Sequence, residues 1–226
     1  EWDSDLCSGY ENIGLPDADI EREIDDCDVF WVHGWQTRTI RSAMAYAAGN
    51  GVPVLMRGEN WSGAMPDGPG LRGIAKRLYL RSIFGRCRGF LCIGSMNRRY
   101  YADHGITADR LFDMPYAIDN EAFSARARAA DQGALRKDLG IPDGRKVVLF
   151  AGKLSARKHP DLLLRAWQDA DWQGNRPVLL FVGDGDLSDT LRRRAAGDDD
   201  VIFAGFRNQN ELPGIYALSD VFVLAS

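Results

Sequence analysis

The stretch Val147-Val148-Leu149-Phe150-Ala151-Gly152-Lys153-Leu154-Ser155-Ala156-Arg157-Lys158 joins a run of five apolar residues to a loop with three cations. An uninterrupted apolar run of this length is typical of a strand that is buried on both faces of a parallel sheet. Pro160 follows at the first turn of a predicted helix that extends to Ala170. A strand, a loop and a helix in this order predict one repeat of a parallel α/β sheet.

The same alternation of strand and helix patterns extends in both directions along the chain. Apolar runs predict strands at residues 28–32, 52–56, 89–93, 111–114, 147–151, 178–182, 201–204 and 221–224. A polar, alanine-rich segment separates the fourth run from the fifth. We therefore expect an α/β fold with two Rossmann-like, doubly wound parallel-sheet domains. The first domain would span residues 1–120, an interdomain linker residues 121–145, and the second domain residues 146–226.

Both predicted domains are expected to be incomplete. No glycine-rich turn opens the first domain, and the chain stops at Ser226, where a ligand-binding loop is expected to follow a core strand. The second sheet would have the doubly wound strand order three-two-one-four. Its last strand would then form an open apolar edge, so this chain alone is expected to aggregate. Because ligand-binding segments would lie beyond its ends, it is also expected to lack enzymatic activity.

Composition argues against several classes of protein. The 226 residues carry a formal net charge of −4, which does not suit a protein that wraps nucleic acid, so no nucleic-acid partner is expected. No apolar run approaches the ~18 residues of a membrane-spanning helix, and the first residues lack the pattern of a signal peptide. The four cysteines and three histidines are not spaced as zinc ligands. We expect a cytoplasmic protein with free, buried thiols.

The positive charge is concentrated in one segment. Residues 68–102 contain eight basic residues and no acidic one. Leu71, Ile74 and Leu78 fall on one face of a predicted helix in this segment. Two interpretations stay open: an ordinary solvated face, or a surface through Arg72–Arg99 that meets an anionic membrane or an anionic acceptor.

The basic loop after the strand at residues 147–151 has the chemistry of an anion site. Gly152 lets the backbone approach a ligand closely, and Lys153, Arg157 and Lys158 place three cations in one short loop. The helix that follows adds positive potential at its N-terminus. This combination suits a diphosphate, although a basic surface loop would have the same composition.

A second loop, Gly183-Asp184-Gly185-Asp186, follows the strand predicted at residues 178–182. Its glycines resemble the start of a dinucleotide-binding fingerprint, but Ser188 stands where the third glycine would be. Its two aspartates resemble a metal-binding pair. The loop also fits a tight turn in which Asp186 caps the next helix.

The motifs of the second half occur in the order and spacing of one known family. The chain resembles the retaining glycosyltransferases of family 4, which have the GT-B architecture. The motifs that carry the resemblance are Gly152-Lys153-Leu154 with Lys158, Val182-Gly183-Asp184-Gly185, Phe203-Ala204-Gly205, Glu211-Leu212-Pro213 and Tyr216-Ala217-Leu218-Ser219-Asp220-Val221-Phe222-Val223-Leu224. The first half is similar more loosely, at residues 28–34, at Ile93-Gly94-Ser95 and at Pro115-Tyr116-Ala117-Ile118-Asp119, where Tyr116 and Ala117 depart from the family pattern. The family's later pair of glutamates would lie beyond Ser226.

The resemblance implies a donor site in the second domain. The residues placed along the donor are Gly152, Lys153, Arg157, Lys158, Gly183, Phe206, Arg207 and Leu212. Lys153 and Lys158 would hold the diphosphate of a UDP-, GDP- or ADP-sugar and stabilise it as it leaves, so neither a metal ion nor a cofactor is required. Phe206, Arg207 and Leu212 would lie along the nucleobase.

The resemblance also implies that the first domain binds the acceptor. His33 ends a predicted strand at a position common in the family, although a histidine there is more often a hydrogen-bonded core residue. Arg57 and Glu59 stand where many members have a histidine, and either could contact the donor or the acceptor. The aromatic cluster Phe30, Trp31 and Trp35 is expected to pack rather than to bind a sugar.

The function implied is transfer of a sugar from a nucleotide-sugar donor to a glycan, lipid or small-molecule acceptor, with retention of configuration. Two other classes stay open. One is another nucleotide- or dinucleotide-binding enzyme with Rossmann-type domains. The other is a non-catalytic binding module with a glycosyltransferase-like fold.

Overall fold

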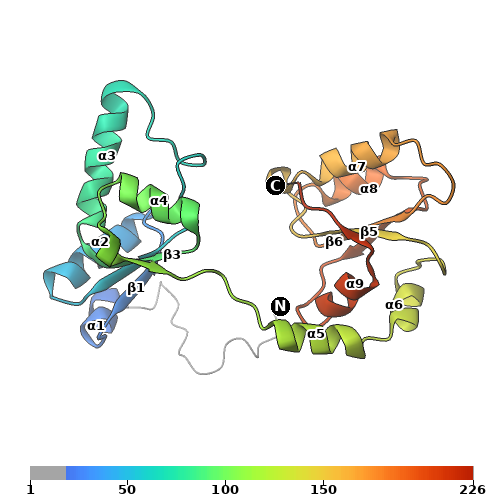
Figure 1. Ribbon diagram of the computed structural model, residues 1–226, viewed down its shortest axis with the longest axis horizontal. Helices are drawn as coiled ribbons and strands as arrows, with labels where there is room; N and C mark the ends of the chain where they lie inside the picture. The colour runs from blue at the N-terminus through green and yellow to red at the C-terminus, as the bar shows by residue number, and fades with distance from the viewer. Residues whose placement is uncertain (1–18, 226) are drawn as a thin grey trace. The chain divides into compact units, whose positions relative to one another are not determined.

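The computed structural model describes residues 19–225, which divide into two compact units, residues 19–117 and 118–225 (Figure 1). Each unit is built on a parallel sheet of four strands. The predicted α/β fold with two parallel-sheet domains is confirmed. Residues 121–145, for which the sequence predicts a linker, hold two helices that lie within the second unit.

The first unit alternates strands and helices along the chain. Its elements are α1 (Ile20–Asp25), β1 (Phe30–His33), α2 (Arg38–Gly49), β2 (Val54–Arg57), α3 (Gly70–Phe84), β3 (Cys87–Cys92), α4 (Ser95–Asp103), the 3-10 helix η2 (Ala108–Arg110) and β4 (Leu111–Asp113). The sheet order is β1-β2-β3-β4. Thr37 caps α2, because its side-chain oxygen accepts a hydrogen bond from the Ile40 N–H at 3.2 Å.

The helices α2, α3 and α4 share one apolar core with one face of the first sheet. Met44, Phe84 and Tyr101 are fully buried in this core. The other face carries Trp31 and Phe112, which are 50% and 51% exposed in the part of the chain that the structure describes. The packing prediction is therefore wrong for Trp31, whereas Trp35 is buried in the core and Phe30 packs against it.

Helix α3 presents two different faces. Leu80 and Phe84, near its C-terminal end, are fully buried in the core. Leu71, Ile74 and Leu78, the apolar stripe seen in the sequence, are 84%, 56% and 61% exposed. The stripe therefore lies on the solvent side of the helix rather than in the core.

The second unit contains the motif-rich half of the chain. Its elements are α5 (Asn120–Ala129), α6 (Gln132–Asp138), β5 (Val147–Ala151), η3 (Ala156–Lys158), α7 (Pro160–Asp169), β6 (Val178–Val182), α8 (Ser188–Arg194), β7 (Val201–Gly205), α9 (Leu212–Leu218) and β8 (Val221–Phe222). The sheet order β7-β6-β5-β8 is the predicted order three-two-one-four. The sheet is covered on both faces, by α9 with the segment around α6 on one and by α7 with α8 on the other. This arrangement explains why all five residues of β6 are buried.

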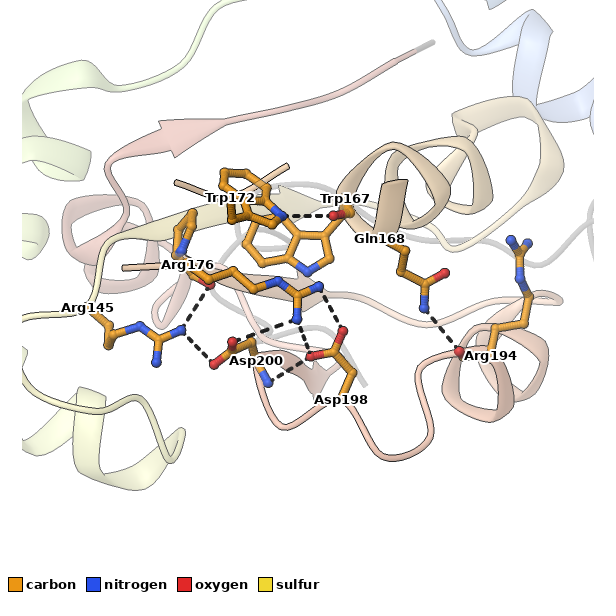
Figure 2. Close-up of polar contacts among 9 residues, drawn as sticks. Arg145, Trp167, Gln168, Trp172, Arg176, Arg194, Asp198 and Asp200 are labelled. Atoms are coloured by element: carbon orange, nitrogen blue, oxygen red, sulfur yellow. Dashed lines mark hydrogen bonds and ion pairs between the residues drawn. The ribbon is translucent and has the colours of Figure 1, made fainter. Parts of the chain in front are cut away.

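Arginine–aspartate pairs join the loops at the edge where the strands of the second sheet begin (Figure 2). Arg145 donates to Asp200 at 2.6 Å, and Arg176 makes two bonds of 2.9 Å to the Asp198 carboxylate. The Arg176 guanidinium also lies 5.1 Å from the centroid of the Trp167 ring. These contacts tie the starts of three strands together, at the edge opposite to the motif loops.

Three cysteines lie in the described residues, and all three are free thiols. Cys87 and Cys92 are buried as predicted, and burial raises the pKa of Cys87 to about 12. Cys27 is exposed, so the prediction of a buried thiol is wrong there. Cys7 lies outside the described residues.

Candidate functional site

A cavity of about 430 Å³ lies where β5, β6 and β7 end, at the carboxyl edge of the second sheet. In open parallel sheets this edge is where ligands bind. Six residues that the sequence places along the donor line this one cavity, namely Gly152, Lys153, Gly183, Phe206, Arg207 and Leu212. They come from three separate motifs, which the fold brings together.

Two glycines allow the loops after β5 and β6 to touch. A Cβ atom on Gly183 would lie 2.1 Å from the carbonyl oxygen of Gly152, and Gly183 has a φ of +123°. The Gly152 N–H donates to the Val182 carbonyl at 2.9 Å. Gly185 faces a similar limit, because its Cβ would lie 2.5 Å from the Leu154 carbonyl oxygen. Backbone packing therefore accounts for Gly183 and Gly185 without a dinucleotide fingerprint.

Asp184 fixes the start of α8. Its Oδ1 accepts hydrogen bonds from the Ser188 hydroxyl and, at 2.8 Å, from the Gly185 N–H. These two bonds, the one from Ser188 foremost, hold the pKa of Asp184 below its usual range. The N-cap residue of α8 is Leu187, whose side chain makes no capping hydrogen bond. The interpretation in which Asp186 caps this helix is therefore wrong. Within residues 19–225 no three His, Cys, Asp or Glu side chains gather as metal ligands.

The loop between β7 and α9 forms another wall of the cavity. Phe206 is 51% exposed there. The Glu211 carboxylate accepts a bond of 3.0 Å from Arg207 Nη1 and a bond of 2.9 Å from the Asn208 N–H. The Asn208 N–H foremost, and then Arg207, lower the pKa of Glu211. Asp138 of α6 lies 3.7 Å from the Arg207 guanidinium. Glu211 thus ties the start of a short turn, Arg207 and Asn208, to its end, and so fixes the residues that follow Phe206.

The cations of the basic loop separate in the structure. Lys153 lines the cavity, whereas Arg157 and Lys158 lie on η3, outside its lining. His159 links η3 to α7 in a left-handed conformation, with a φ of 48°. With Lys153 on its wall, the cavity offers a cation to an anionic group.

Four further residues line this cavity, and none of them was predicted from the sequence to bind the donor: Ala151, Val182, Asp184 and Tyr216. Asp184 lies between the two glycines, and Tyr216 lies on α9. Burial raises the pKa of Tyr216. The family-like motif that begins at Tyr216 was the signal that could have identified it.

The acceptor-side candidates lie in the first unit. His33 and Arg57 end β1 and β2 as register partners, and Glu59 follows β2 closely. His33 is exposed, so the interpretation as a core histidine is wrong. The Arg57 guanidinium lies 4.6 Å from the centroid of the Tyr116 ring, and the Tyr116 hydroxyl donates to Glu59. The structure therefore adds Tyr116, seen in the sequence only as a departure from the family pattern, to the neighbourhood of Arg57 and Glu59.

Sequence comparisons relate this chain to known glycosyltransferases. Residues 131–226 match the model of the family Glycosyl transferases group 1. The spore coat protein SA of Bacillus subtilis is 34% identical over 101 residues, which cover 41% of this chain and 26% of that protein. A GDP-mannose-dependent alpha-(1-6)-phosphatidylinositol monomannoside mannosyltransferase of Mycolicibacterium smegmatis is 31% identical over 118 residues, 49% of this chain and 29% of that one. The match spans less than a third of either relative.

Solved structures extend the similarity to both units. HepE of Anabaena, in complex with UDP-glucose, aligns with a TM-score of 0.67 over 92% of this chain and 56% of that chain, at 15% identity. WaaG, whose structure is described as that of a glycosyltransferase involved in lipopolysaccharide biosynthesis, aligns with a TM-score of 0.55. Identities this low show a shared fold alone. The chain therefore has the two-unit α/β fold of GT-B glycosyltransferases, and its residues 131–226 match the group 1 family of these enzymes.

Proposed function

We propose that the protein transfers a sugar from a nucleotide-sugar donor to an acceptor, with retention of configuration. The observation that carries this proposal is the 430 Å³ cavity, because it gathers six predicted donor residues from three motifs at the ligand-binding edge of the sheet. The family match and the names of the relatives support it: one relative is named for GDP-mannose, and the HepE structure holds UDP-glucose. A UDP-, GDP- or ADP-sugar is the proposed donor.

The proposed chemistry uses the protein's own cations. When the bond between sugar and diphosphate breaks, negative charge builds up on the leaving diphosphate. Lys153 would stabilise that charge from the cavity wall, and Lys158 with Arg157 would add positive potential from η3. This scheme needs no metal ion or cofactor. Retention is inferred from the resemblance of the motifs to family 4.

The acceptor is proposed to bind the first unit. His33, Arg57 and Glu59 lie at the carboxyl edge of its sheet, where Tyr116 joins them. A glycan, a lipid or a small molecule would each offer the hydroxyl group that such a transfer needs. Arg57 and Glu59 supply hydrogen-bond donors and acceptors for orienting that hydroxyl group.

We also propose that the first unit meets the cytoplasmic face of an anionic membrane. Leu71, Ile74 and Leu78 are exposed on α3, and the neighbouring side chains Arg72 and Arg81 are exposed as well. Exposed apolar residues with basic neighbours are typical of a helix that lies on a lipid surface. No described helix is long and apolar enough to span a bilayer.

The experiment that tests this function follows nucleoside diphosphate release by the whole protein from UDP-, GDP- and ADP-sugars. The proposal expects release from one donor class that continues in the presence of a metal chelator. The anomeric configuration of the product, measured by NMR, should equal that of the donor. Release of no diphosphate from any donor in the presence of sugar and lipid acceptors would contradict the proposal.

A further inference from the structure

A second cavity, of about 410 Å³, lies at the carboxyl edge of the sheet in the first unit. The loop after β2 contributes Glu59 and Trp61, and the start of α4 contributes Ser95, Met96 and Asn97. Its volume falls within the roughly 300–1,000 Å³ of small-molecule sites. Trp61 belongs to none of the motifs recognised in the sequence.

The Trp61 ring is held in place by the backbone below it. A Cβ atom on Gly63 would lie 2.0 Å from Cζ3 of the Trp61 ring, so the indole packs directly against this glycine. The Met65 N–H donates to the Trp61 carbonyl at 2.9 Å and closes a turn beneath the ring. The Trp61 residue remains 43% exposed, which leaves indole surface open to a ligand.

Buried hydrogen bonds fix the two loops that form the cavity. Asn97 is only 3% exposed. Its Oδ1 accepts from the Ile93 N–H at 3.2 Å, and its Nδ2 donates to the Asn60 carbonyl at 2.7 Å. This side chain therefore joins the loop after β2 to the loop before α4. The Tyr116 hydroxyl, by donating to Glu59, orients the carboxylate on the rim.

The chemistry of the lining indicates a neutral, polyhydroxylated ring as the ligand. An open indole face can stack on the C–H groups of a sugar ring, while a carboxylate and a hydroxyl accept or donate hydrogen bonds at the ring's hydroxyls. Among residues 19–225 no lysine or arginine lines this cavity, which disfavours a phosphate group. We propose that Trp61, Glu59 and Ser95 form a subsite for a pyranose ring of the acceptor, so that the acceptor is a glycoside. This proposal rests on the proposed glycosyl transfer.

The test uses saturation-transfer NMR on the whole chain, with the methyl glycosides of glucose, mannose and galactose as probes. At least one glycoside should bind saturably, and Trp61→Ala should weaken it by about ten-fold or more. Gly63→Ala should weaken it in the same way, because the new methyl group displaces the ring. Trp172→Ala is the control: it removes an indole that is 37% exposed in the second unit, outside this cavity, and should leave binding unchanged.

Binding of UDP, GDP and ADP to each variant is measured in parallel. If no glycoside binds, or if Trp61→Ala and Gly63→Ala both bind it as the unchanged chain does, the subsite is overturned. Nucleotide binding that persists in that case leaves the proposed transferase function standing. If glycosides bind but none of the three nucleotides does, the donor proposal fails and the subsite stands as a sugar-binding site. Should Trp61→Ala fail to fold, Gly63→Ala decides the question.

Discussion

At the scale of single residues, Lys153 occupies the position that matters most for a diphosphate, since it is the lysine on the wall of the 430 Å³ cavity. A charge-assisted hydrogen bond to phosphate contributes roughly 1.5–3 kcal/mol. Lys153→Ala should therefore weaken nucleoside diphosphate binding by about ten-fold or more in calorimetry. Lys158→Ala should act in the same direction from η3. The exposed Lys137 of α6 offers a control, and unchanged affinity in both loop variants would remove the assignment.

Glu211 acts on the donor only through the turn that it holds. Glu211→Ala removes both hydrogen bonds that fix Arg207 and Asn208, so the Phe206 wall should lose its shape. Calorimetry should then show several-fold weaker UDP or GDP binding, while inorganic diphosphate binds as before. Glu121→Ala, an exposed change on α5, is the control. An equal loss of affinity for the nucleotide and for inorganic diphosphate would show that Glu211 does not act through the part of the cavity that binds the nucleobase.

The lowered pKa of Glu211 predicts the pH dependence of this effect. A carboxylate whose folded pKa lies below the ordinary 4.5 stays ionised above that value and loses its bonds only as the pH falls through the folded pKa. The contribution of Glu211 to nucleotide affinity should thus stay constant from pH 7 to about pH 4.5 and decrease at lower pH. A loss already complete at pH 6 would point to another group.

Site residues could be predicted from the sequence where they belong to a motif. The residues that they contact in space could not. Gly183 was expected to line the cleft, but its contact with the Gly152 carbonyl depends on the pairing of β5 with β6. Trp61 and Tyr116 are isolated aromatic residues in loops. The tertiary fold places the Tyr116 hydroxyl against Glu59 and places Trp61 in the same cavity as Glu59. No local sequence pattern could have identified either residue.

At the scale of elements, α3 has an apolar stripe that faces solvent. If this stripe meets lipid, changing Leu71, Ile74 and Leu78 together to Ser should reduce co-sedimentation with phosphatidylglycerol vesicles by about ten-fold or more, since each apolar side chain contributes roughly 1.5–3 kcal/mol when buried. Binding should also weaken with salt, because each nearby cation contributes about 1 kcal/mol through the surface potential. Leu162→Ser, at an exposed position of α7, is the matched control. Equal binding to neutral and anionic vesicles would support an ordinary solvated face instead.

The arginine pairs at the amino edge of the second sheet should stabilise that unit (Figure 2). The side chains of Arg176 and Asp198 are 27% and 20% exposed, so removing one partner leaves a partly buried charge. Arg176→Ala should lower the free energy of unfolding by about 1–3 kcal/mol in denaturant titration. Arg165→Ala, at an exposed position of α7, should change it by less than about 0.5 kcal/mol. Equal effects in the two variants would mean that the pairs are only surface contacts.

The strands were the most predictable elements, for a physical reason. The run at residues 178–182 is apolar at every position and forms β6, which is buried at every position. The helix α3 was predictable as a helix, but its orientation was not. Its buried residues near the C-terminal end and its exposed stripe are both apolar, and periodicity alone does not say which face meets the core.

At the scale of the whole molecule, the two units follow different plans. In the second unit the order β7-β6-β5-β8 reverses direction along the sheet, as expected for a doubly wound fold. In the first unit the order β1-β2-β3-β4 has no such reversal within residues 19–117. The proposed division of labour gives the nucleotide to the second unit and the acceptor to the first.

Chemical-shift mapping of UDP, GDP and ADP on the isotope-labelled chain measures directly whether the second unit binds the nucleotide. One of these nucleotides should bind, and the largest backbone shifts should fall at Gly152–Lys153, Gly183–Asp184 and Phe206–Leu212, which line or border the cavity. The amides of residues 19–117 should shift little by comparison. Saturable binding with its main shifts in residues 19–117, or no binding by any of the three, would contradict the central claim.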